Sequence, residues 1–182
     1  MGERSVMYKV KPLEFKLSPI DGMYEAYGID DLCFSYTVEG EDPDCLTIDA
    51  CVTQDIGDGD VSACLESTYF YSSVDEVVLH LSYFHELYML GRYLVPTETR
   101  GLYKVKPLSW YDNGNVLIGQ GVDAYSYTYK KEEEEVKLLI RCPPCFDTER
   151  SYTFEGQLAE QQAKHAANNH YEQCLAKYLE EV

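Results

Sequence analysis

One hexapeptide occurs twice in this chain of 182 residues and limits what the chain can fold into. Residues 8–13 read Tyr-Lys-Val-Lys-Pro-Leu, and residues 103–108 repeat the same six, 95 positions later. Further matches follow in the same order at drifting offsets: Phe34 to Thr37 with Tyr125 to Thr128, Cys51 with Cys142, and Arg92 to Leu94 with Lys177 to Leu179. Duplication followed by insertions and deletions in loops leaves matches of this kind. The sequence therefore predicts two diverged copies of one unit.

The predicted fold class is α+β with an internal duplication, in which each copy is a small antiparallel β-sheet followed by one C-terminal helix. The first copy is expected at residues 1–95, a linker at 96–102 and the second copy at 103–182.

The strands are predicted from alternation. Apolar and polar side chains alternate over residues 46–53, and turn residues follow at 55–60. Alternation at period two is typical of a strand with one buried face, so residues 45–71 are expected to form a hairpin. Strands of the second copy are expected at residues 116–120, 123–129 and 136–141.

Each copy is expected to close with a helix. Ser73 followed by Glu76 is a capping box, and apolar residues then keep helical spacing up to Gly91, which is a natural stop. This first helix is apolar nearly all round, which predicts burial on more than one side. The second helix, at about residues 157–180, has one apolar stripe and should pack by one face.

The bulk composition narrows the class of protein. The chain holds no apolar run long enough to span a membrane and no N-terminal signal pattern, so a cytoplasmic location is expected. The seven cysteines are an odd number, and in that compartment they are expected to be reduced thiols. No catalytic motif for acyl transfer, phosphate binding or metal-dependent proteolysis occurs, so a non-enzyme is predicted.

Acidic residues are concentrated in the first copy. No Lys or Arg lies between Lys16 and Arg92, while sixteen Asp and Glu do. Of the formal net charge of −17, residues 103–182 account for only −4, from nine Lys and Arg against 13 Asp and Glu. A balance this acidic repels nucleic-acid phosphates and anionic membranes, so the expected partner is a basic protein surface.

Ten carboxylates are the candidate partner-binding residues: Asp30, Asp31, Glu39, Glu41, Asp42, Asp44, Asp49, Asp55, Asp58 and Asp60. Residues two apart on a strand lie about 7 Å from one another on one face, which is similar to the spacing of phosphates along a nucleic-acid strand. Each like-charged pair at that distance costs about 0.6 kcal/mol in water. A basic partner would relieve this repulsion, whereas the simplest alternative is an acidic surface that only keeps the protein in solution.

The second copy also resembles a known group of proteins. Its Lys-Pro-Leu-x-Trp opening (residues 106–110), its Tyr-Ser-Tyr segment and its closing Ala-rich helix resemble small proteins encoded by phages and prophages of gut bacteria. The resemblance covers residues 103–182 and, more loosely, 8–95, where Phe15 replaces the Trp. It implies context and fold and carries no catalytic signature. An acidic tandem protein in that context is similar in charge and size to phage anti-CRISPR proteins that inhibit Cas9-type nucleases.

The resemblance and the charge together predict an inhibitor that binds a basic DNA-binding surface of a Cas9-type nuclease, with no cofactor. Two alternatives stay open. One is a structural phage protein that self-associates through some of its 17 tyrosines. The other is a small metal-binding protein that uses Cys142 and Cys145, which have the spacing of half a zinc site, with Cys45, Cys51, His80 or His85 as further ligands.

Overall fold

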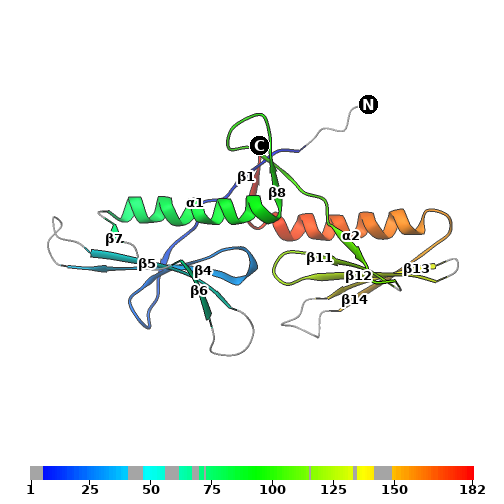
Figure 1. Ribbon diagram of the computed structural model, residues 1–182, viewed down its shortest axis with the longest axis horizontal. Helices are drawn as coiled ribbons and strands as arrows, with labels where there is room; N and C mark the ends of the chain where they lie inside the picture. Colours follow the sequence, from blue (N-terminus) through cyan, green and yellow to red (C-terminus); the bar gives the residue numbers. More distant parts are fainter. Residues whose placement is uncertain are drawn as a thin grey trace. The chain divides into compact units, whose positions relative to one another are not determined.

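The computed structural model describes residues 6–40, 47–55, 62–66, 70–71, 73–114, 116–132, 135–141 and 149–182. The chain divides into two compact units. The first unit comprises Met1–Tyr103 and Glu180–Val182, and the second comprises Lys104–Leu179. The described residues form an α+β protein with antiparallel sheets and two helices (Figure 1).

The first unit begins with short strands and ends with a long helix. Its elements are β1 (Tyr8–Val10), β2 (Lys16–Leu17), β3 (Tyr24–Tyr27), the turn η1 (Ile29–Asp31), β4 (Leu32–Glu39), β5 (Thr47–Asp55), β6 (Ser62–Glu66), β7 (Phe70–Tyr71), α1 (Val74–Arg92) and β8 (Leu94–Pro96). The strands β2 to β6 follow one another in a sheet, and β7 also pairs with β5. The predicted hairpin of residues 45–71 is confirmed where it is described, because β5 and β6 pair antiparallel.

A second sheet brings distant parts of the chain together. Its strand order is β15-β1-β9-β8, where β9 is Tyr103–Val105 and β15 is Leu179–Glu181. In this sheet Tyr8 lies opposite Tyr103, so β1 and β9, which begin the two copies of the repeated hexapeptide, pair antiparallel. The amide of Val182 also donates to the carbonyl oxygen of Met7 at 3.0 Å.

Helix α1 begins where the sequence predicts. The hydroxyl of Ser73 accepts a hydrogen bond from the amide of Glu76 at 3.2 Å, which satisfies one of the free donors of the first turn. The helix does not stop at Gly91, as the glycine suggested, but continues to Arg92 with Tyr93 as its C-cap.

The packing of α1 differs from the prediction that it is buried on more than one side. Its fully buried residues are Val77, Leu81, His85 and Met89, spaced four apart along one stripe. This stripe covers the inner face of the sheet, where Phe34, Ile48 and Val52 have no exposure, and Figure 1 shows α1 lying across that sheet. The other apolar positions of α1 include exposed residues, so composition overestimated the burial of this helix.

The second unit has a simpler sheet and a smaller helix face. Its elements after β9 are β10 (Trp110–Asp112), β11 (Leu117–Gln120), β12 (Ser126–Glu132), β13 (Glu135–Arg141), β14 (Arg150–Glu155) and α2 (Ala159–Leu175). The strands β10 to β14 form an antiparallel sheet in chain order. The three strands predicted for this part are confirmed with small changes at their ends, whereas β10 and β14 were not predicted.

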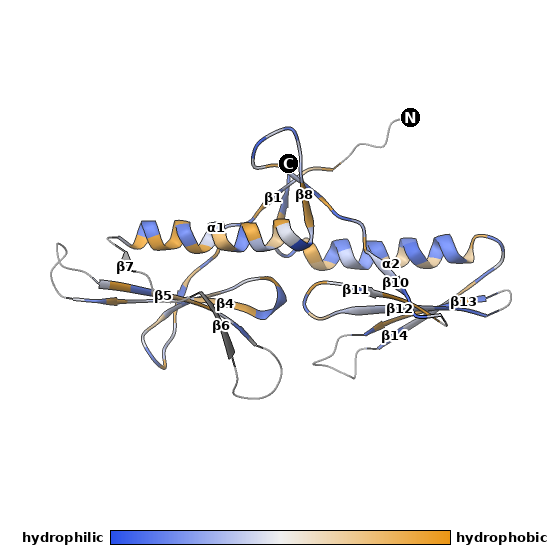
Figure 2. Ribbon diagram, viewed as in Figure 1, coloured by the Kyte–Doolittle hydropathy of each residue, from blue (hydrophilic) through white to orange (hydrophobic). Residues whose placement is uncertain are grey.

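Helix α2 packs by one face, as predicted. Its alanines at 159, 163 and 167 are buried, and the large buried side chains of the sheet include Tyr127 and Tyr129. Small buried residues on the helix are thus combined with large buried residues on the sheet. The helix ends at Leu175 rather than near residue 180, because residues 179–181 form β15. Figure 2 shows that α2 is more hydrophilic along its length than α1.

Among the described residues, neither α1 nor α2 is long and apolar enough to cross a membrane.

Candidate functional site

The ten predicted partner-binding carboxylates are only partly described. Glu41, Asp42, Asp44, Asp58 and Asp60 lie outside the described residues, and of Asp55 only the backbone at the end of β5 is described. The side chains of Asp30, Asp31, Glu39 and Asp49 are described, and their surroundings differ.

The described carboxylates do not gather at one point of the first unit. Asp31 is exposed just before β4, and Glu39 is exposed at the end of that strand, about 26 Å away along an extended chain. Asp49 lies opposite Thr37 on β5 and is half-buried. One of its carboxylate oxygens has no exposure and no hydrogen-bond partner among the described residues. Asp31 and Glu39 are therefore the two described members whose side chains are exposed at the surface.

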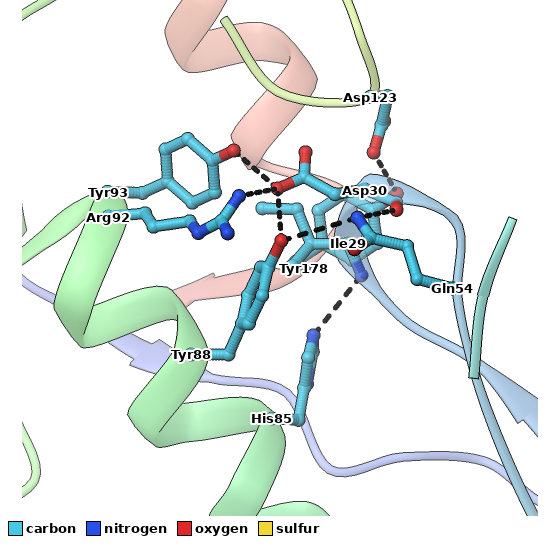
Figure 3. Close-up of polar contacts among 9 residues, drawn as sticks. All are labelled: Ile29, Asp30, Gln54, His85, Tyr88, Arg92, Tyr93, Asp123 and Tyr178. Carbon is cyan, nitrogen blue, oxygen red and sulfur yellow. Dashed lines mark hydrogen bonds and ion pairs between the residues drawn. The ribbon is translucent and has the colours of Figure 1, made fainter. Parts of the chain in front are cut away.

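Asp30 belongs to an internal cluster rather than to a surface (Figure 3). The residue is 9% exposed. Its Oδ2 accepts hydrogen bonds from the hydroxyls of Tyr93 at 2.5 Å and Tyr88 at 3.1 Å, and Arg92 Nη1 lies 3.8 Å from the same oxygen. Both tyrosines lie on or just after the last turns of α1, and Asp30 precedes β4. Asp30 is therefore almost fully buried and bonded within the unit, unlike an open surface carboxylate, and its role in partner binding stays a prediction.

The backbone presents Asp30 to this cluster through an uncommon conformation. Asp30 and Asp31 have φ of 56° and 58°, in the left-handed region that Asp tolerates better than most residues. The amide of Gly28 closes the turn on the carbonyl oxygen of Leu32 at 2.8 Å. Gln54 Nε2 donates to the carbonyl oxygen of Asp30 at 3.1 Å, which ties the turn to β5 as well.

The charge of Asp30 acts on the tyrosines around it. Burial is the main reason that the pKa of Tyr93 is raised, and its hydrogen bond to Asp30 and the negative charge of that carboxylate raise it further. The pKa of Tyr88 is raised by burial and then by the charge of Asp30, while Arg92 acts in the opposite direction. The guanidinium of Arg92 stands 4.3 Å from the centroid of the Tyr88 ring, in a cation–π contact. Both hydroxyls therefore remain protonated donors to the carboxylate.

The second unit contains the same kind of cluster around Asp123. Asp123 and Ala124 have φ of 50° and 59°, and the amide of Gly121 donates to the carbonyl oxygen of Tyr125 at 2.8 Å. The hydroxyl of Tyr178 donates to Asp123 Oδ1 at 2.9 Å, and Lys177 Nζ lies 3.4 Å from Oδ2. In both units a basic residue and the tyrosine after it contact a carboxylate on a left-handed turn; the pair lies at the C-terminal end of α1 in the first unit and after α2 in the second.

A histidine packs behind each of these turns. In the first unit, buried His85 accepts a hydrogen bond from the amide of Ile29 through Nε2 at 3.3 Å, and its ring meets Phe34 edge to face at 5.5 Å. In the second unit, His170 Nδ1 is hydrogen-bonded to the hydroxyl of Tyr127 at 2.9 Å, with the rings edge to face at 5.7 Å. Burial lowers the pKa of both histidines, to about 4 for His85.

Glycine is required where these rings approach the turns. A Cβ on Gly28 would lie 2.7 Å from the Phe34 ring, and a Cβ on Gly121 would lie 2.6 Å from the Tyr127 ring. Either contact is too short for any residue larger than glycine. The Gly-x-Asp signal at 28–30 and 121–123 could have been found in the sequence, together with the Arg-Tyr-Leu and Lys-Tyr-Leu match, but it was missed.

These clusters are suited to holding structure. Each carboxylate is surrounded by hydroxyl and cationic donors, and each histidine is partly or fully desolvated and hydrogen-bonded. Among the described side chains, only Cys174 lies beside a cluster as a nucleophile next to a base. Its sulfur lies 3.7 Å from His170 Nδ1, but the residue is buried.

The described residues provide little for a metal or cofactor. No group of three His, Cys, Asp or Glu side chains in the described part of the chain is placed to hold a metal ion. Cys45, Cys142 and Cys145 lie outside the described residues, so the predicted half zinc site is not among them. An open pocket of about 440 Å³ lies in the second unit, lined by Lys131, Glu135, Val136, Gly156, Gln157, Ala159 and Glu160. Its acidic and basic side chains are exposed or half-exposed.

No protein-family model, curated protein or solved structure matches the chain.

Proposed function

We propose that this chain is a phage- or prophage-encoded inhibitor that acts in the host cytoplasm by binding the basic DNA-binding surface of a Cas9-type, RNA-guided nuclease. The observation that carries the proposal is the division of charge between the two units. The first unit holds six Lys and Arg against 21 Asp and Glu, a formal net charge of −15, whereas the second has a net charge of −2.

The division of charge favours a basic partner over an acidic surface without a ligand. Charges of both signs interspersed over a surface are enough to keep a small domain in solution. The second unit follows that pattern, with ion pairs such as Lys137 to Glu132 at 2.7 Å and Arg141 to Glu149 at 2.9 Å. The first unit does not, since no Lys or Arg occurs over the 75 residues between Lys16 and Arg92. The repulsion that results is relieved when a cationic groove covers the carboxylates.

The same proposal includes the origin of the chain by internal duplication. It is supported by the repeated hexapeptide, by the order of strands, helix and terminal strand in each half, and by the two carboxylate clusters. In this scheme the second copy kept a mixed surface as a scaffold, and the first became the acidic binding unit.

A salt series tests the proposal. Purified Cas9, with and without guide RNA, is captured on the immobilised full chain at increasing NaCl concentration. We expect binding that weakens steeply with salt, because contacts between carboxylates and a basic groove are screened. Binding that is absent, or that does not change with salt, would contradict the proposal.

Two variants of equal net charge separate specific contacts from a general charge effect. In one, Asp42, Asp44, Asp58 and Asp60 are replaced by Asn in the first unit. In the matched control, Glu133, Glu134, Glu155 and Glu172 are replaced by Gln in the second unit. We expect a loss of nuclease binding of at least about tenfold in the first variant and little change in the second. Equal losses would show that binding depends on net charge alone and would contradict the proposal that the first unit binds the nuclease.

A further inference from the structure

The outward face of α1 carries a stripe of apolar side chains that are largely exposed. Leu79, Tyr83 and Leu87 are 72%, 56% and 46% exposed. They are spaced four residues apart, so they lie on one side of the helix, opposite the stripe that packs on the sheet. We refer to these three residues as the α1 stripe.

Folding of the first unit does not require apolar residues at these positions. The sheet is covered by Val77, Leu81, His85 and Met89, which lie on the other side of α1. Polar residues with the same helix propensity, such as Gln, would serve the helix equally well. Single exposed apolar residues are ordinary, but three in one row form a contiguous patch of the kind found at interaction sites. Tyr83 is also of the residue type that is enriched at interfaces.

The shape of the stripe fits a second helix. It extends over about 12 Å, or two helical turns. A flat row of side chains with this spacing is complementary to an amphipathic helix that presents apolar residues at i, i+3, i+4 and i+7.

The charge of the surroundings selects the kind of helix. The exposed acidic residues Asp75 and Glu76 stand in the first turn of α1, and the first unit as a whole carries a formal net charge of −15. A second copy of this chain would bring two such units together against strong repulsion. A helix with Lys or Arg beside its apolar face would gain attraction at the rim as well as burial.

We infer that the α1 stripe is a docking site for an amphipathic helix with basic flanks, contributed by a partner protein. The site shares no residue with the carboxylates proposed to bind a nuclease, and it does not depend on the identity of that nuclease.

The test uses two isomeric probes with the full chain. Both are fluorescent peptides of about 18 residues made only of Leu and Lys in equal proportion, long enough to become helical on binding. One places Leu at helical spacing, and the other alternates Leu and Lys, so that the charge is equal and only the pattern differs. At about 150 mM salt, where long-range attraction is screened, we expect the helical pattern to bind at least about tenfold more tightly by fluorescence anisotropy.

Two variants assign the preference to the stripe. The triple variant Leu79→Gln, Tyr83→Gln, Leu87→Gln should lose the preference between the peptides. The matched control Leu17→Thr, Ile20→Thr, Tyr27→Thr removes three other exposed apolar side chains of the first unit and should keep it. The α1 variant should fold normally because the buried face of its helix is intact. Circular dichroism measures whether its helix content is unchanged.

Several results would overturn the inference. One is equal binding of the two peptides by the wild-type chain, and another is an equal loss in both triple variants. A wild-type dimer in sedimentation that the α1 variant abolishes would assign the stripe to a second copy instead. Because the four-Asn variant described above should weaken both peptides alike and keep the preference, a failure here is distinguishable from a failure of nuclease binding.

Discussion

Buried Asp30 shows why carboxylates cannot be assigned to a surface by residue type alone. The sequence counts Asp30 among ten acidic residues in a stretch without cations. In the structure, its left-handed backbone turns the side chain towards Tyr93, which lies 63 residues further along the chain. That contact depends on how α1 crosses the sheet, so no local pattern could predict it. The neighbour Asp31 has the same residue type but is exposed.

Loss of the Tyr93 hydroxyl should destabilise the first unit. In Tyr93→Phe the carboxylate of Asp30 loses its shortest donor, and hydrogen bonds to charged groups contribute about 1.5–3 kcal/mol. We therefore expect a decrease of about 2 kcal/mol in the free energy of unfolding, measured by urea titration. The matched substitution Tyr178→Phe removes a donor from Asp123, whose side chain is more exposed, and should cost less. A Tyr93→Phe protein as stable as wild type would contradict the structural role of the cluster.

Buried His85 should make the stability of the first unit depend on pH. Burial holds its pKa at about 4, below the value of 6.5 expected for an exposed histidine. Between these values the unfolded state binds the proton and the folded state does not, so stability is complete above pH 6.5 and is lost as the pH falls towards 4. At pH 5 the loss from this group is about 2 kcal/mol relative to pH 7.

The variant His85→Gln isolates this contribution, because carboxylates near neutral pH contribute equally to both proteins. Urea unfolding of the variant should show a smaller decrease in stability between pH 7 and pH 5 than that of the wild type. His80→Gln, at a half-exposed histidine on the same helix, is the control. If the pH dependence of stability were the same in His85→Gln as in the wild type, burial would not lower the pKa of His85 in the folded protein.

At the scale of elements, features that depend on residues close in sequence were predicted well. Features that depend on contacts between distant residues were not. The capping box fixed the start of α1 correctly, and alternation placed β5, β12 and β13. The end of α2 was wrong because β15 joins a sheet with β1, at the other end of the sequence. Sequence alignment also paired Phe34 with Tyr125, whereas the ring packed against the turn glycine is that of Phe34 in the first unit and that of Tyr127 in the second. A shift of two residues keeps a side chain on the same face of a strand, so alternation alone cannot detect it.

The N-cap of α1 allows a quantitative test at this scale. Ser73→Ala removes the acceptor for the amide of Glu76 and should cost about 1 kcal/mol in the free energy of unfolding. Ser73→Asp keeps an oxygen acceptor and adds a negative charge at the helix N-terminus, so it should restore stability. Ser82→Ala, within the helix, should be neutral or stabilising because alanine has the higher helix propensity. A harmless Ser73→Ala would show that α1 does not depend on this cap.

At the scale of the whole molecule, the two units should respond differently to salt. The first unit carries a formal net charge of −15 and the second −2, so self-repulsion weakens mainly the first. Raising the salt concentration shortens the Debye length from about 30 Å at 0.01 M to about 8 Å at 0.15 M and screens this repulsion. The first unit should therefore gain stability with salt, while the second should change little.

The single tryptophan allows the two responses to be separated. Trp110 belongs to the second unit, where its ring meets Tyr129 edge to face at 5.0 Å, so its fluorescence reports the unfolding of that unit. Far-ultraviolet circular dichroism reports both units, including α1. We expect added NaCl to raise the melting temperature seen by circular dichroism more than the one seen by Trp110. Equal shifts would mean either that the units unfold as one or that the acidic charge does not destabilise the first. Replacing Asp42, Asp44, Asp58 and Asp60 by Asn decides between these two explanations. If repulsion among the carboxylates destabilises the first unit, this variant should be more stable than the wild type at low salt.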